Sequence, residues 1–172
     1  GWKELIDSVS DVAPEHPEVH LALIGCRGEK EKNEVMAYAR ETGMAGRVSA
    51  IEYRSDMPNV FASCDLVVDA SWAGTGITGT IREAMSMRKP VIATSAGGNG
   101  ELVTSPDVGW LIPMKDRPAL STAIRAVIAD PVRASAVAHT AREHVVRGYS
   151  KELRIERLER LYTDILTTKR LL

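Results

Sequence analysis

The amino-acid sequence predicts an α/β fold built on a doubly wound parallel sheet. Apolar runs of strand length alternate with longer segments of helical periodicity, which is typical of a parallel sheet with helices on both faces. The runs are almost continuously apolar, as expected when both faces of a sheet are covered. The 172 residues, 44% of them hydrophobic and 26% charged, fit a single domain over residues 1–172 with a core of its own.

The first half of the chain alternates three helix patterns with three strand patterns. Apolar residues at helical spacing open the chain, and Pro14 and Pro17 end this first helix. A charged amphipathic helix ends at Gly43, and Asp56 is the candidate N-cap of a short helix. In chain order, we expect a helix over residues 2–12, a strand over 19–25, a helix over 29–42, a strand over 48–51, a helix over 56–64 and a strand over 66–70.

The second half adds two strands and then becomes helical. Its first helix should stop before Pro90, because a residue that precedes proline avoids the helical conformation. Pro131 suits the first turn of a later helix. The expected elements are a helix over residues 80–87, strands over 90–94 and 110–112, and helices over 117–129, 131–147 and 151–166. The last helix carries an apolar stripe and a charged, solvated face.

Charge and cysteine content exclude several classes of protein. The net charge is −1 and the basic residues are scattered, whereas nucleic-acid binding needs a concentrated basic face. The sequence holds no apolar run of membrane-spanning length and no signal peptide. Cys26 and Cys64 lie in apolar stretches without the spacing of metal ligands, which predicts buried free thiols in a reducing cytoplasm. The sequence shows no Asp/His cluster that indicates a metal.

The segment from Gly74 to Thr80 (GTGITGT) carries the strongest chemical signal. It follows a predicted strand and opens a predicted helix. Glycine allows the backbone to approach a ligand closely, and the free N–H groups at a helix N-terminus attract phosphate. The segment therefore predicts a phosphate-binding loop. A second pair, Gly97 and Gly98, follows the next strand and forms either an ordinary turn or a surface near a bound sugar.

Gly74, Gly76 and Gly79 also fit the G-x-G-x-x-G pattern of dinucleotide-binding proteins. That pattern expects a carboxylate at the end of the next strand to hold a ribose, and residues 93–95 (ATS) contain none. The pattern also belongs to the first strand of its domain, whereas several elements precede it here. A dinucleotide-dependent oxidoreductase is therefore the weaker interpretation.

Glu83 lies one turn into the helix that the glycine-rich loop opens. Thr80 and Glu83 have the spacing of a capping box, in which the carboxylate satisfies a backbone N–H. The functional alternative is that the carboxylate points back over the loop and accepts hydrogen bonds from both hydroxyls of a nucleotide ribose. The local pattern alone favours the cap.

Five segments together resemble the family 4 glycosyltransferases, which are retaining enzymes of the two-domain GT-B architecture. The similar segments are residues 52–58 (EYRSDMP), 62–66 (ASCDL), 82–94 (REAMSMRKPVIAT), 97–101 (GGNGE) and 109–113 (GWLIP). The similarity covers essentially the whole chain. It implies the Rossmann-like, C-terminal half of a GT-B fold, which binds the donor nucleotide-sugar.

The resemblance implies a UDP- or GDP-sugar as donor substrate, with no metal and no other cofactor. Glu83 matches the second glutamate of the family's paired motif, which holds the ribose. The first glutamate, which contacts the donor sugar in the family, belongs eight residues earlier, where this sequence has Thr75. The implied sites are Glu83, Tyr53 and Arg54 for the nucleotide, Ile77, Thr78 and Gly79 for the diphosphate, and Thr75 and Gly76 for the donor sugar.

The resemblance also implies parts that lie outside residues 1–172. The family's diphosphate-neutralising Arg and Lys precede a Lys-Gly dipeptide whose glycine matches Gly1, and an N-terminal acceptor-binding domain usually supplies a catalytic His. We therefore assign no catalytic residue within this chain and expect it to be inactive alone. The parent protein is expected to be a hexosyltransferase in the cytoplasm, or peripherally bound at the inner face of the membrane. The alternative is a non-catalytic, degenerate transferase-like binding domain, which Thr75 favours.

The chain opens inside a helix pattern without a methionine, which predicts further sequence before Gly1. In the family, the strand before Gly1 lies between the strands at residues 19–25 and 66–70. If that strand is lacking, either another chain fills the gap, or these two strands pair with each other, or the printed sequence omits residues. We favour the third outcome.

Overall fold

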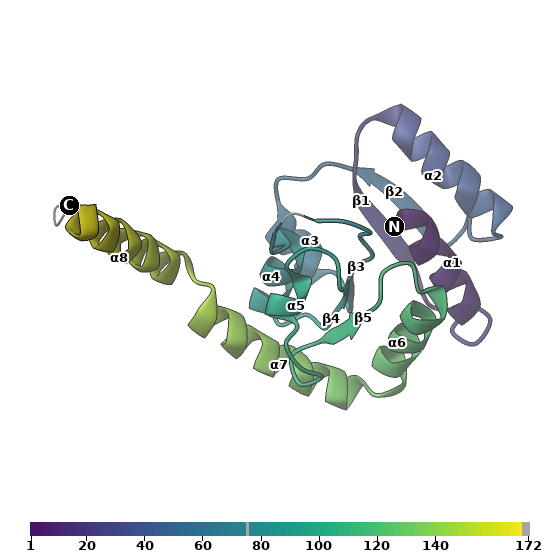
Figure 1. The fold of residues 1–172 in the computed structure, drawn as a ribbon. Helices are drawn as coiled ribbons and strands as arrows, with labels where there is room; N and C mark the ends of the chain where they lie inside the picture. The colour runs from purple at the N-terminus through teal and green to yellow at the C-terminus, as the bar shows by residue number, and fades with distance from the viewer. Residues whose placement is uncertain (75, 170–172) are drawn as a thin grey trace.

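The computed structural model describes residues 1–74 and 76–169, and its elements follow one another much as the sequence predicts (Figure 1). The elements are α1 (Trp2–Val12), β1 (Leu21–Cys26), α2 (Glu29–Glu41), β2 (Val48–Glu52), α3 (Met57–Ala62), β3 (Val67–Asp69), α4 (Gly79–Ser86), β4 (Val91–Thr94), α5 (Asn99–Leu102), β5 (Trp110–Ile112), α6 (Arg117–Ala129), α7 (Pro131–Gly148) and α8 (Lys151–Lys169). The predicted boundaries move by at most three residues. The short helix α5 was not predicted.

The described strands pair in parallel, as predicted, but they form two sheets. β1 pairs with β2, where Leu21 lies opposite Val48, and β4 pairs with β3 and β5, where Val67 of β3 lies opposite Val91. β1 and β3 are not hydrogen-bonded to each other. The outcome in which these two strands pair directly is therefore wrong. The family strand expected between them stays a prediction.

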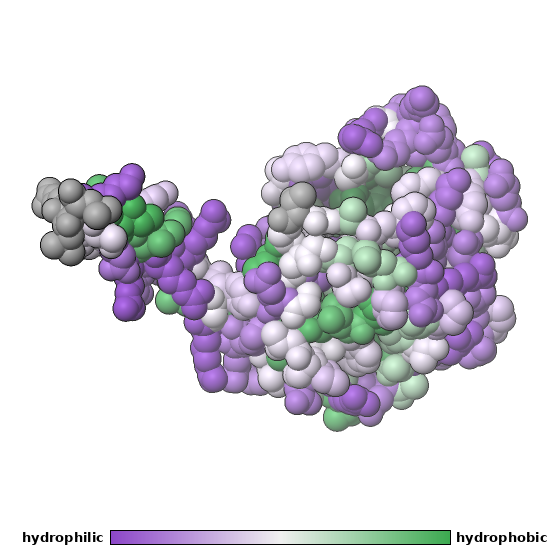
Figure 2. Space-filling view, in the orientation of Figure 1, coloured by the Kyte–Doolittle hydropathy of each residue, from purple (hydrophilic) through white to green (hydrophobic). Residues whose placement is uncertain are grey.

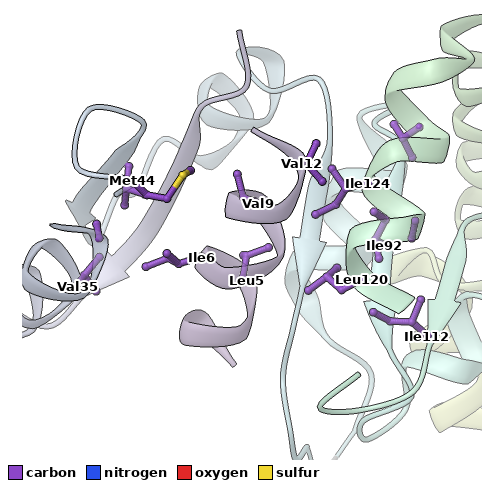
Figure 3. Packing of buried hydrophobic residues seen from close by; sticks show 14 of the residues in the cluster. Leu5, Ile6, Val9, Val12, Val35, Met44, Ile92, Ile112, Leu120 and Ile124 are labelled. Carbon is purple, nitrogen blue, oxygen red and sulfur yellow. The ribbon is translucent and has the colours of Figure 1, made fainter. Parts of the chain in front are cut away.

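Helix α1 packs between the two sheets and joins them through its side chains. Figure 3 shows Ile6 directed toward Val35 of α2, and Val12 directed toward Ile124 of α6. Ile6 and Val12 are both fully buried. One apolar core therefore runs from one sheet to the other. At the start of α1, Gly1 lies so close to the carbonyl of Ala70 that a β-carbon would overlap it.

A second apolar core fixes helix α4. Ile81, Ala84 and Met85 are fully buried on the face of α4 that packs against β3, β4 and α7. A guanidinium N–H of Arg142 on α7 donates a hydrogen bond to the carbonyl of Ser86 at the end of α4. These contacts hold the N-terminus of α4 at the carboxyl ends of β3 and β4.

Helix α8 projects from the body of the molecule (Figure 1). None of its residues is buried, and Figure 2 shows apolar side chains beside charged ones along it. The predicted apolar stripe is exposed at Leu158, Leu161, Tyr162, Ile165 and Leu166, and the earlier Ile155 is exposed as well. Throughout the described ranges, the helices are too short or too polar to cross a membrane.

Both cysteines are free thiols, as predicted, but only Cys26 is buried. Cys64 is half-buried, because it follows the short helix α3 at the edge of the second core. Burial raises the pKa of both thiols.

Candidate functional site

The candidate site lies at the carboxyl ends of β3 and β4, where ligands bind in parallel α/β sheets. One loop runs from β3 to α4 and contains the glycine-rich segment, and a second loop runs from β4 to α5 and contains Gly97 and Gly98. Thr75, predicted to contact the donor sugar, lies outside the described residues. Gly76 is exposed.

The two glycine loops pack backbone against backbone. The N–H of Gly98 donates a hydrogen bond to the carbonyl of Gly76, at 2.9 Å. A β-carbon on Gly98 would lie 2.8 Å from the amide nitrogen of Ile77, and one on Gly97 would lie 2.9 Å from the carbonyl oxygen of Gly76. Gly97 also has a left-handed φ of +54°. Side chains at these positions would separate the loops, so glycine is required at both.

Helix α4 begins at the end of the first loop without a side-chain cap. Thr78 is the N-cap residue, has extended backbone angles and makes no capping hydrogen bond from its side chain. The first N–H groups of a helix lack intrahelical acceptors, and the helix dipole adds positive potential there. Ile77, Thr78 and Gly79, predicted to bind the diphosphate, therefore surround a helix end suited to an anion.

Glu83 is not the capping residue that its spacing suggested. A capping box needs Thr80 at the N-cap position, but the N-cap is Thr78 and Thr80 is already the second residue of α4. The Glu83 carboxylate instead points back toward the helix start, where Oε1 lies 3.6 Å from the position of a β-carbon on Gly79. The side chain is exposed. The carboxylate therefore stands beside the uncapped N-terminus of α4, in contact with solvent.

Tyr53 and Arg54, predicted to bind the nucleotide, follow directly after β2. Tyr53 is 80% exposed, so its ring is free to contact a ligand. The Arg54 guanidinium forms two hydrogen bonds with Asp56, at 2.8 and 2.6 Å. Asp56 was predicted to cap α3, but its carboxylate binds Arg54 and makes no capping bond. The Arg54 guanidinium is thus already paired with a neighbouring carboxylate.

Sequence reasoning missed Asp69, the last residue of β3. Asp69 is only 8% exposed, and both its oxygens accept hydrogen bonds: Oδ1 from the amide and hydroxyl of Ser71, and Oδ2 from the side-chain amide of Asn99 at 3.3 Å. Burial alone raises the pKa of Asp69, but hydrogen bonds from Ser71, Thr78 and Asn99 outweigh it and hold the pKa below its usual value. The available signal was a charged residue that ends an apolar strand.

Of two hollows among the described residues, one lies away from the glycine loops and one lies at the carboxyl ends of β3 and β4. One of about 350 Å³ beside α7 is lined by Val108, Thr140, Glu143, His144, Arg147 and Gly148. The other, about 10 Å³, is lined in part by Glu4, Trp72 and Lys115. Among the side chains that the structure describes, no group of three His, Cys, Asp or Glu residues could hold a metal ion. The chemistry of the glycine loops therefore makes them the candidate site.

The chain is similar to known glycosyltransferases in sequence and in fold. The family described as glycosyl transferases group 1 matches residues 1–130. The UDP-Gal:alpha-D-GlcNAc-diphosphoundecaprenol alpha-1,3-galactosyltransferase of Escherichia coli is 26% identical, over 89% of this chain and 39% of that protein. The GDP-mannose-dependent monoacylated alpha-(1-6)-phosphatidylinositol monomannoside mannosyltransferase of Corynebacterium glutamicum is 29% identical, over 98% of this chain and 44% of that protein.

The solved structure of Anabaena Alr3699/HepE in complex with UDP is also similar. It matches with a TM-score of 0.86 and 27% identity, over 94% of this chain and 44% of that chain. The fold is thus the Rossmann-like, C-terminal half of a GT-B architecture, as predicted. The chain spans less than half the length of the curated relatives it matches.

Proposed function

The chain belongs to the glycosyl transferases group 1 family, and we propose that it binds the nucleotide-sugar donor of a retaining glycosyltransferase. The donor is a UDP- or GDP-sugar. The sugar is transferred to a glycan, a lipid-linked molecule or another acceptor held by an N-terminal domain, which the intact protein supplies. Residues 1–172 alone are the donor-binding part and transfer little sugar.

One observation carries this proposal: the Glu83 carboxylate stands beside the uncapped N-terminus of α4. A nucleoside diphosphate carries its ribose hydroxyls and its anionic diphosphate side by side. The hydroxyls suit a carboxylate acceptor, and the diphosphate suits the free N–H groups around Thr78 and Gly79. A nucleotide bound in this way extends its base toward the backbone after β2, near Tyr53.

The chemistry we propose for this chain is stabilisation of the leaving group. When the bond between the sugar and the diphosphate breaks, negative charge grows on the diphosphate oxygens. Fixed N–H dipoles at the start of α4 stabilise that charge without reorganising. The resemblance implies that Thr75 and Gly76 contact the donor sugar, where a hydroxyl at position 75 offers a neutral hydrogen bond and the family offers a carboxylate.

Further groups that act at the site are expected from parts of the intact protein outside residues 1–172. We propose that the cations that neutralise the diphosphate precede Gly1 and that the protein acts in the cytoplasm or at the inner face of the membrane. We find no described residue that replaces a catalytic histidine of the missing domain. His16, His20 and His139 are at the surface, and His144 packs against Tyr149.

Calorimetric titration of the intact protein with UDP, GDP, ADP and NAD tests the proposal. We expect UDP or GDP to bind and NAD not to bind. Binding of NAD without UDP or GDP would instead support the oxidoreductase interpretation. With the matching nucleotide-sugar, release of nucleoside diphosphate indicates an enzyme, and the anomeric configuration of the product, measured by NMR, tests retention. Binding without release supports the degenerate binding domain, which Thr75 favours.

A further inference from the structure

We propose that Asp69 and Asn99 form a buried positioning pair that locks the two glycine loops into one rigid donor-binding surface. The ligand part of this inference rests on the proposed function. The locking of the loops does not, because it follows from contacts within the chain.

A closed ring of hydrogen bonds connects the starts of the two loops. The Asp69 carboxylate accepts from the amide of Ser71 at 2.9 Å and from the side-chain amide of Asn99 at 3.3 Å. The same Asn99 nitrogen donates to the carbonyl of Thr94 at 3.1 Å. The Thr94 hydroxyl donates to the carbonyl of Ser71 at 2.6 Å, which closes the ring.

The ring is shielded from water. Asn99 is fully buried, Thr94 is 2% exposed and Asp69 is 8% exposed. Burying a carboxylate costs free energy unless favourable contacts compensate for it. An apolar side chain at the end of β3 could be buried at a lower cost in free energy. Stability alone therefore does not account for a charged residue here, whereas control of the loop geometry does.

The pair acts beside the direct contact between the loops. Asn99 follows Gly98, whose N–H binds the carbonyl of Gly76. Ser71, which binds the Asp69 carboxylate, opens the loop that leads to Thr78 and the free N–H groups of α4. A shift of Asn99 would therefore move both the second loop and the amides offered to the diphosphate.

The charge of Asp69 argues for a positioning role and against a direct attraction. A carboxylate under an anion-binding loop repels a diphosphate, so its charge by itself weakens binding. The benefit must come from the geometry that its hydrogen bonds impose. Removing the charge of Asp69 should lower the Kd for nucleotide if repulsion dominates and raise it if loop geometry dominates. The direction of the change in Kd therefore tests the inference.

The first test measures hydrogen exchange of the ligand-free intact protein. Asn99→Ala removes the hydrogen bonds to Asp69 and Thr94 and keeps the negative charge of Asp69. Losing two net hydrogen bonds should speed exchange of the amides at 71–74, 76–79 and 96–98 by about tenfold or more. Unchanged protection at Gly98 overturns the inference. Asp69→Asn, which keeps the shape of the side chain, gives a second measure if Asn99→Ala does not fold.

The matched control is Ser121→Ala. Ser121 is also a buried, hydrogen-bonded polar residue, but it binds Asp11 between α1 and α6, outside the glycine loops. We expect exchange in both loops to stay as in the wild-type protein. If Ser121→Ala speeds amide exchange in both loops as much as Asn99→Ala does, the effect is a general loss of stability, and the inference is overturned.

The second test measures the Kd for UDP and GDP by calorimetry. Asn99→Ala and Asp69→Asn should each raise the Kd of the nucleotide that binds, by about fivefold or more. Tighter binding in Asp69→Asn would mean that charge and not position matters, and it overturns the inference. If the wild-type protein binds neither nucleotide while the loops still loosen in both variants, the proposed function fails and the locking pair stands.

Discussion

The Glu83 carboxylate lies over Gly79, one turn before it on the same helix, with Oε1 3.6 Å from the position that a β-carbon would occupy. Glycine leaves this side of the first turn open. A carboxylate and a row of free N–H groups are therefore exposed together at one helix end, although they attract ligand groups of opposite character. This pairing is the basis of the first prediction.

Glu83→Gln should weaken nucleotide binding without unfolding the protein. Charge-assisted hydrogen bonds contribute about 1.5–3 kcal/mol each, so the Kd of UDP or GDP should rise roughly 10- to 100-fold. The side chain is exposed, so the free energy of unfolding should change by less than about 0.5 kcal/mol. Calorimetric titration and urea unfolding measure the two quantities. An unchanged Kd together with a stability loss of about 1 kcal/mol would restore the capping role.

Gly98→Ala should separate the two glycine loops. The new β-carbon would lie 2.8 Å from the amide nitrogen of Ile77, so the backbone must move and the Kd for nucleotide must rise. The control is Gly46→Ala, because a β-carbon there meets nothing within 4 Å. We expect the control to keep the wild-type Kd and Tm. Equal nucleotide affinity in the two variants would show that contact between the loops does not shape the site.

Thr75→Glu should change the choice of donor sugar. The resemblance places this residue where the family has a glutamate that contacts the sugar, so a carboxylate there adds charged hydrogen bonds to sugar hydroxyls. We expect the Tm to stay within about 2 °C of wild type, as for a substitution in a ligand loop. Transfer rates across a panel of UDP- and GDP-sugars measure the effect. An unchanged profile shows that residue 75 does not contact the sugar.

Asp11→Asn should destabilise the protein at neutral pH and lose this effect in acid. Asp11 on α1 accepts two hydrogen bonds from Arg117 at the start of α6, at 2.8 and 2.6 Å, and one from Ser121. The hydrogen bond from Arg117 is the main cause that lowers the pKa of Asp11.

A lowered pKa in the folded state stabilises the protein above the unfolded pKa, and this stabilisation is lost as pH falls through the folded value. The pair is partly exposed, so we expect a loss of about 1 kcal/mol or less at pH 7. Urea unfolding at about pH 7 and about pH 3 measures the difference between the variant and the wild type. A difference that does not shrink in acid contradicts the assignment.

Local patterns predicted the helices and strands, because caps, prolines and apolar periodicity act within a few residues. They did not predict α5, whose four residues are too few to show a period. The sequence also identified the glycine-rich loop, since a strand, glycines and a helix follow one another there. The contact of Gly76 with Gly98 was out of reach, because it depends on the pairing of β3 with β4.

Two side-chain roles were also hidden for physical reasons. The capping-box pattern at Thr80 and Glu83 was misread because the N-cap is Thr78, two residues earlier than the pattern implied. Asp69 looked like an ordinary strand end, since its partner Asn99 lies 30 residues away. The first outcome depends on where α4 begins, and the second on where the fold places Asn99 of α5, and local spacing determines neither.

The position of α1 between the two sheets has a mechanical consequence. Side-chain packing around Ile6 and Val12 of α1 couples β1–β2 to β3–β5, so it resists sliding of the two sheets relative to each other. The loop after β2 belongs to one half, and the loops after β3 and β4 belong to the other. We expect a ligand that contacts both groups of loops to add a second connection between the two halves of the domain.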